Sequence, residues 1–232
     1  MSETRWYLGF GASQTLFQLN EDYKASLIGS SDKEQAKRLQ ELLTCFADEC
    51  LNQYFIVPVE KVKVNPVGRK IVFGGVSAIK KTIHLTLKQV TKKMSAQDRA
   101  QMAEYIDNLL LPLRESSRYP TYVALEISDN LRNRLGQAVT EGRNQSPAAV
   151  SSDYSDALCE LIEVALDGYM NRPLGMMKLG RVMNKITSVA SDTIRGAAQT
   201  IVKKVIGSMS DREMMGFFDF SESILYPQPA HS

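Results

Sequence analysis

Apolar residues recur at steps of three and four over most of this chain, and that spacing restricts the fold more than any other feature of the sequence. It places apolar side chains on one face of an α-helix. The clearest example follows Ser31, which forms a capping-box pattern with Glu34 at the start of a helix. We expect this helix to end at Pro58. Its predicted core face includes Leu39, Leu43 and Phe46.

The same spacing predicts helices in six further segments. They cover residues 72–94, 95–112, 120–138, 152–169, 174–207 and 210–220. Ser95 and Ser210 are predicted N-caps, because each is followed three residues later by an acidic residue. Residues 82–88 also alternate with period two, as a half-buried strand does, but the helical pattern matches more positions there.

We therefore predict a mainly α protein, a bundle-like domain of six or seven helices. Minor short strands are expected near residues 59–72, where Val62 and Val64 alternate with lysines. The core should also contain residues from the later helices. They are Ile106, Leu110, Ile127 and Leu131.

The segment 142–151 is small, polar and without periodicity, so it is predicted to be a linker. It would join an N-terminal helical region, 1–141, to a C-terminal helical region, 152–232, and the two regions can pack as one domain. No internal repeat is evident. The first residues lack the pattern of a secretory signal, and the three cysteines have no paired spacing, so we expect a cytoplasmic protein.

Positive charge is concentrated in two segments, although the formal net charge is only +2. Residues 69–93 contain seven cations and no acid, and residues 172–209 contain seven cations and one acid. Such asymmetry is informative about partners rather than about the fold. The cations that we predict to bind an anionic surface or a partner are Lys178, Arg181, Lys185, Arg195, Lys203, Lys81, Lys88 and Lys92.

The segment 174–207 is predicted to be a basic amphipathic helix, with apolar residues mostly opposite its cations. Such a helix can lie on an anionic membrane surface. Alternatively, it packs on the rest of the protein and its cations pair with the acidic helix face between Asp153 and Asp167. Nucleic acid is the less favoured partner, because Phe73 is the only aromatic residue of the two basic segments and no DNA-binding motif is evident.

No residue pattern indicates a catalytic site, a metal site or a cofactor. The sequence places no nucleophile or acid beside His84, which we expect to be at the surface or half-buried. Cys45 and Cys50 lack the spacing of zinc ligands, and Gly74-Gly75 belongs to no complete phosphate-binding motif.

These observations favour a non-enzymatic helical interaction protein or adaptor, which binds an unidentified protein or a second copy of itself. The alternative is a peripheral protein that binds an anionic surface, membrane or nucleic acid, through helix 174–207. A second alternative is an enzyme whose site assembles from residues that are distant in sequence. The sequence resembles no family known to us.

Overall fold

The computed structural model describes residues 4–112 and 121–229, which are mainly α-helical with a small antiparallel sheet. This confirms the predicted fold class. In chain order the elements are β1 (Thr4–Gly11), α1 (Gln14–Ser26), α2 (Asp32–Leu51), α3 (Val57–Val62), α4 (Pro66–Val90), α5 (Ala96–Leu109), β2 (Leu110–Leu111), β3 (Tyr122–Ile127), α6 (Asp129–Asn144), α7 (Ser151–Leu166), α8 (Arg172–Gly175), α9 (Arg181–Ile206), α10 (Asp211–Ser223) and β4 (Leu225–Pro229). Short 3-10 turns cover Thr91–Lys93 and Pro147–Val150, and π-helical turns cover Asn52–Ile56 and Asp167–Asn171.

The strands form one sheet in the order β2-β3-β1-β4, with every neighbouring pair antiparallel. The central pair, β1 and β3, places Tyr7 opposite Glu126 and Gly11 opposite Tyr122. On the outer side of β1, Thr4 lies opposite Pro229 in β4. The two ends of the described chain therefore meet at one edge of the sheet.

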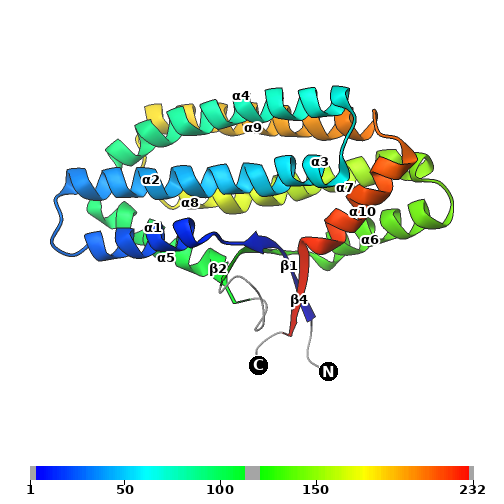
Figure 1. Cartoon of the computed structure of the whole chain (residues 1–232). Coiled ribbons are helices and arrows are strands. Elements are labelled where there is room, and N and C mark those ends of the chain that lie inside the picture. The colour runs from blue at the N-terminus through cyan, green and yellow to red at the C-terminus, as the bar shows by residue number, and fades with distance from the viewer. Residues whose placement is uncertain (1–3, 113–120, 230–232) are drawn as a thin grey trace.

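The helices form layers on one side of the sheet (Figure 1). α4 and α9 form the outermost layer, and α2 and α7 lie beneath them. The sheet occupies the opposite side. α1 and α5 lie beside it toward one end of the molecule, and α6 and α10 lie beside it toward the other end. The fold therefore presents two different faces, one made of two long helices and one made by the sheet and shorter helices.

The second half of the chain repeats the elements of the first half at a constant interval. Tyr54 and Tyr169, one in each π turn, are 115 residues apart. The same interval relates Ser13 and Ser128, the N-caps of α1 and α6. Contrary to the sequence-based expectation, the protein therefore contains an internal repeat.

The repeats are arranged about a pseudo-two-fold axis between β1 and β3. At the interval of 115 residues, Tyr7 is equivalent to Tyr122 and Gly11 is equivalent to Glu126. Exchanging each residue for its equivalent turns the Tyr7–Glu126 pair into the Tyr122–Gly11 pair, and both pairs are present in the sheet. Likewise β2 pairs with β3 as β4 pairs with β1. The two halves thus exchange strands, and each completes the sheet of the other.

The predicted N-caps are confirmed at all three positions. The Ser31 hydroxyl accepts the Glu34 N–H, while Ser95 and Ser210 each form a reciprocal capping box with the acid three residues later. These caps satisfy backbone donors that have no partner inside the helix. Local sequence therefore defines where α2, α5 and α10 begin.

Pro58 does not end the helix that begins after Ser31, contrary to prediction. α2 continues through the π turn into α3, and the Val57 N–H donates to the Asn52 carbonyl, five residues earlier. A π turn shifts the hydrogen-bond pattern, so the ring of the following proline is accommodated without the usual break. Pro173 follows the second π turn in the same way.

Two other predicted boundaries were wrong. Residues 59–72 contain no strand. α3 ends at Val62, and its C-cap Lys63 has a left-handed φ of 60°; the Asn65 side chain then caps α4 by accepting the Gly68 N–H. The predicted helix over 120–138 is instead strand β3 followed by α6, which Ser128 caps; residue 120 lies outside the described residues. β3 is buried at nearly every position because both of its faces are covered. Val123, Leu125 and Ile127 join the main core clusters, while Tyr122 and Ala124 form a smaller cluster with Tyr226, so the strand lacks the alternation of a half-buried strand.

The predicted core residues are buried or half-buried. Leu39, Phe46, Ile106, Ile127 and Leu131 are buried, and Leu43 and Leu110 are partly buried. Residues 82–88 are helical, which confirms the prediction of a helix over the alternative of a strand. Within the described part of the chain, no helix combines the length and apolar character that a membrane span requires.

Candidate functional site

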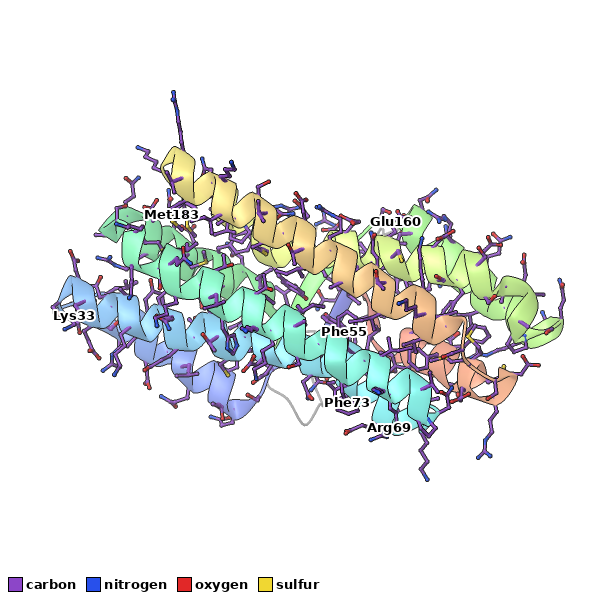
Figure 2. All side chains as sticks on the ribbon, turned by 90° about the horizontal axis from the view of Figure 1, so that it is seen from above. Lys33, Phe55, Arg69, Phe73, Glu160 and Met183 are labelled. Carbon is purple, nitrogen blue, oxygen red and sulfur yellow. The ribbon has the colours of Figure 1, made fainter. Side chains whose placement is uncertain are left out.

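The outward-facing surfaces of α4 and α9 form one broad surface, named here the α4/α9 face. Figure 2 shows the two helices side by side when the protein is seen from above. Their inner stripes are buried, with Val76 and Ile79 from α4 and Ile194 from α9 in one core cluster. A Cβ atom at Gly75 would lie 2.5 Å from the Ile201 side chain, so a glycine there allows the helices to approach closely.

Four aliphatic side chains are exposed on this face. Val67 and Leu85 of α4 are 64% and 53% exposed, and Val182 and Val189 of α9 are 74% and 58% exposed. Val182 and Val189 were predicted to lie opposite the cations, yet they lie outside the core. The reason is geometric, since at about 100° per residue both fall on the flank of the apolar stripe and not at its centre.

Six of the eight predicted binding cations are exposed and form no ion pair within the described part of the chain. They are Lys81, Lys88 and Lys92 in and after α4, and Lys178, Arg181 and Lys185 before and in α9. Lys70, at the position equivalent to Lys185, is also exposed and has no ion pair there. Because α4 and α9 pack side by side, the fold brings the two cationic segments next to each other.

The other two predicted cations pair with acids. Arg195 Nε lies 2.9 Å from Glu163 Oε2, and Lys203 Nζ lies 3.6 Å from Asp156 Oδ1. Both acids belong to the acidic face of α7, so the predicted internal pairing occurs at these two cations. The pairs are partly exposed, and such pairs each contribute only about 0–1 kcal/mol to stability.

Acidic side chains are nearly absent from the α4/α9 face. α4 contains no acid, and the single acid of α9, Asp192, pairs with Arg195 at 2.5 Å. On the flank toward α2, Lys80 and His84 each lie 2.8 Å from Asp48. His84 is half-buried, as predicted. The outer surface therefore carries a net positive charge next to exposed aliphatic side chains.

The two repeats contact each other through a pair of tyrosines. The hydroxyl oxygens of Tyr54 and Tyr169 lie 3.1 Å apart in a hydrogen bond between the two π turns. The Tyr54 ring packs edge-on against Phe10, and the Tyr169 ring packs edge-on against Phe46. One hydroxyl donates to the other, so the second hydroxyl proton has no acceptor within the described part of the chain.

Burial holds these groups in their neutral forms. It raises the pKa of Tyr54 and Tyr169 well above the ordinary value for tyrosine, and it raises the pKa of the Cys50 thiol in the same way. Burial also raises the pKa of Cys45 to about 11. None of these thiols has the lowered pKa of a reactive cysteine.

A cavity of about 240 Å³ lies along the interior, bounded by both repeats. Pairs of equivalent residues line it. They include Leu43 and Leu158, Ala47 and Ile162, Cys50 and Ala165, Pro58 and Pro173, and Ile79 and Ile194. Leu43, Cys50 and Tyr54 line this cavity, and each is only partly buried.

The cavity is apolar. The polar residues in its lining are Thr86, Ser221, Cys50 and the two tyrosines, and no charged residue lines it within the described part of the chain.

The described residues offer little for catalysis or metal binding. They include no cluster of three or more histidine, cysteine, aspartate or glutamate side chains that would hold a metal ion. The cavity lining brings together no nucleophile with a histidine or carboxylate base. Two features of the described residues are suited to binding, the α4/α9 face and the apolar cavity.

Sequence reasoning found the cations of the α4/α9 face but not the aliphatic side chains between them, nor the tyrosine pair. A signal for the pair exists in the sequence: a tyrosine followed four residues later by a proline occurs in both halves, at Tyr54 and at Tyr169. Comparisons with protein-family models, curated proteins and solved structures return no match for this chain.

Proposed function

We propose that this protein attaches peripherally to an anionic membrane through the α4/α9 face. One observation carries the proposal: this face combines exposed aliphatic side chains with cations that have no ion pair within the described part of the chain. Surface-bound helices have the same combination, because cations approach the lipid headgroups while aliphatic side chains enter the boundary with the acyl chains.

The two kinds of side chain would contribute by different means. Each lysine or arginine near an anionic lipid surface is worth about 1 kcal/mol, and the attraction weakens as salt is added. Removing a valine or leucine side chain fully from water is worth about 1.5–3 kcal/mol, and partial insertion is worth less. Five of these cations lie within the two helices, namely Lys70, Lys81, Lys88, Arg181 and Lys185. Together with the four aliphatic side chains they are enough for reversible attachment.

The attachment would use the folded face without opening the protein. The inner stripe of α9, including Ile194, Ile201 and Val205, is part of a core cluster with α4. Exposing that stripe to lipid would remove the core. The preformed outer face avoids this cost, so binding requires no large conformational change.

A lipid surface fits this face better than nucleic acid does. Stacking on bases needs aromatic side chains, and the aromatic residue on the outside of α4, Phe73, lies against the Arg69 guanidinium (Figure 2). The exposed side chains between the cations are aliphatic. A helical adaptor that binds a protein through the same face is the second proposal, and the experiment below separates the two.

The test is co-sedimentation of the purified protein with vesicles of phosphatidylcholine alone or mixed with phosphatidylserine. Binding should require phosphatidylserine and decrease as salt is added. Changing Lys81, Lys88 and Lys185 together to Glu should reduce binding by at least a hundredfold, since three attractions of about 1 kcal/mol become repulsions. The aliphatic contribution is tested by changing Val182 and Val189 to Ser.

The matched control changes three exposed cations on other elements, Lys33, Lys61 and Arg212, to Glu. It alters the net charge equally but leaves the α4/α9 face intact, so binding should stay within a few fold. Equal loss in both triple variants would mean that net charge, and not this face, drives binding. Binding to duplex DNA but not to vesicles, or to neither, would contradict the membrane proposal; binding to neither leaves the adaptor as the better proposal.

A further inference from the structure

The interior cavity is lined by both repeats and extends along the long direction of the molecule. Met94 and Met102 line it toward the end of the molecule that contains α5, and Phe217 and Ile224 line it toward the end that contains α10. Between these ends, the lining passes the tyrosine pair on the pseudo-two-fold axis. Its shape is therefore that of a narrow space for a chain rather than a round chamber for a ring.

The lining chemistry excludes charged occupants. An ionised carboxylate or ammonium group placed there would lose its hydration, and the described lining offers no opposite charge. A hydrocarbon chain, in contrast, would replace empty space with van der Waals contacts. Apolar cavities of this kind exclude water and bind apolar molecules when these are supplied.

The volume limits the size of the occupant. An apolar cavity of about 150 Å³ accepts benzene, which has six non-hydrogen atoms. In proportion, a cavity of about 240 Å³ accepts roughly ten non-hydrogen atoms. That is the size of a medium-length hydrocarbon chain.

The tyrosine pair supplies one polar contact. Its two hydroxyl groups share a single hydrogen bond, so one hydroxyl proton remains to be donated. Both groups are kept neutral by burial. An oxygen atom of the occupant that accepts this proton would satisfy the donor, and such a contact adds specificity in an otherwise apolar site.

We propose that the cavity is a binding site for a neutral, chain-like apolar molecule of roughly ten non-hydrogen atoms, with a hydroxyl or carbonyl oxygen at the Tyr54–Tyr169 pair. This site lies inside the fold and does not depend on membrane attachment through the α4/α9 face. The two proposals therefore fail or succeed separately.

The test measures binding of 1-decanol, decane and decanoate to the intact protein by calorimetry and by thermal unfolding. 1-Decanol should raise the melting temperature by about 5 °C or more when it is present well above its Kd. Decane should bind at least fivefold more weakly than 1-decanol, and decanoate should not bind. No shift with 1-decanol, or binding of decanoate as tight as that of 1-decanol, would overturn the proposal.

Variants locate the site. Ala47→Ile gives the first repeat the residue that the second repeat already has at Ile162, and it should weaken 1-decanol binding at least tenfold by filling the cavity. Ala165→Leu is a second filling variant, used if the first fails to fold. Ala100→Ile adds the same atoms at an exposed position of α5 and should leave binding unchanged. Equal affinity in a folded filling variant and the Ala100→Ile control would overturn the proposal.

Removing both hydroxyl groups tests the polar contact. In the Tyr54→Phe, Tyr169→Phe double variant, 1-decanol should bind only as tightly as decane, while the affinity for decane should stay within twofold. If 1-decanol keeps its advantage over decane in the double variant, the oxygen atom does not contact this pair, and that part of the proposal is wrong.

Discussion

The hydroxyl groups of Tyr54 and Tyr169 lie 3.1 Å apart, although 115 residues separate the two tyrosines in the chain. Each tyrosine is in the π turn that follows the second helix of its own repeat. Their hydrogen bond therefore joins equivalent positions of the two repeats at the pseudo-two-fold axis. π turns are often found at functional sites, and here two of them meet at the lining of the cavity.

A double-mutant cycle on this pair should show coupling. Tyr54→Phe alone or Tyr169→Phe alone leaves one buried hydroxyl without its partner, at a cost of about 1–3 kcal/mol. Removing both hydroxyls should cost clearly less than the sum of the single changes, with a coupling energy of about 1 kcal/mol. Urea denaturation of the four proteins measures this. Strictly additive losses would show that the hydroxyls do not interact.

The stability of the protein should fall steeply in alkali. Because burial raises the folded-state pKa of Tyr54 and Tyr169, their contribution is fully present below the unfolded tyrosine pKa of about 10 and is lost as the pH rises through the folded-state pKa. Each tyrosine should steepen the fall by about 1.4 kcal/mol per pH unit. Denaturation measured up to about pH 11 should show a shallower fall for the double Phe variant. Parallel curves would contradict the raised pKa values.

The capping boxes at Ser95 and Ser210 should contribute similarly, because they occupy equivalent positions in the two repeats. Ser95→Ala and Ser210→Ala should each cost about 1 kcal/mol at neutral pH, whereas Ser77→Ala, on the exposed side of α4, should cost almost nothing. Urea denaturation of the three variants at neutral pH measures these costs. A cost for Ser77→Ala as large as those for Ser95→Ala and Ser210→Ala would contradict the capping role of Ser95 and Ser210.

The carboxylates of these boxes add a pH dependence. Burial raises the pKa of Asp98 and Glu213, but hydrogen bonds from the serine hydroxyl and backbone outweigh it, so both pKa values are lowered. Their contribution is present above the unfolded carboxyl pKa and is lost as the pH falls through the folded-state pKa. The cost of each serine substitution should therefore shrink in acid.

A circular permutant should retain the fold. Thr4 and Pro229 are paired in the sheet, just as Leu111 and Tyr122 are paired. A linker that joins residue 229 to residue 4 can therefore replace the natural connection between residues 111 and 122. A chain that is opened within residues 113–120 and joined from 229 to 4 should unfold cooperatively, with a stability within roughly 2 kcal/mol of the parent. A permutant opened between Gly74 and Gly75, inside α4, should not fold. Loss of folding in the first permutant would contradict the repeat arrangement.

The sequence was sufficient for most helices, because their signals are local. Ser31, Ser95 and Ser210 mark helix starts through contacts within one turn. In α4 and α9 the spacing of the apolar residues along the helix itself indicates which side is buried. The strands were missed because their partners are distant. β1 is a strand because it pairs with residues 122–127 and 225–229, and nothing within residues 4–11 reveals those partners.

The repeat and the site were hidden for a related reason. The equivalent residues that remain identical are scattered, for example Tyr7 and Tyr122, Tyr54 and Tyr169, Pro58 and Pro173, and Pro112 and Pro227. Val182 and Val189 lie at the edge of the apolar stripe of α9, and Val67 and Leu85 lie outside the apolar stripe of α4, so the sequence does not mark the four as one group. The packing of α4 beside α9 brings them onto one surface, so the α4/α9 face could not be derived from the sequence alone.

Tryptophan fluorescence tests the central functional claim most directly, because it reports which face meets the lipid. Val182→Trp and Val189→Trp place an indole on the α4/α9 face, while the single native tryptophan, Trp6, lies in β1 on the opposite side and stacks on Arg132. With vesicles that contain phosphatidylserine, we predict a blue shift for the two introduced tryptophans, none for Trp6, and none for any of them with phosphatidylcholine alone. A shift of Trp6, or binding without a shift at positions 182 and 189, would contradict attachment through the α4/α9 face.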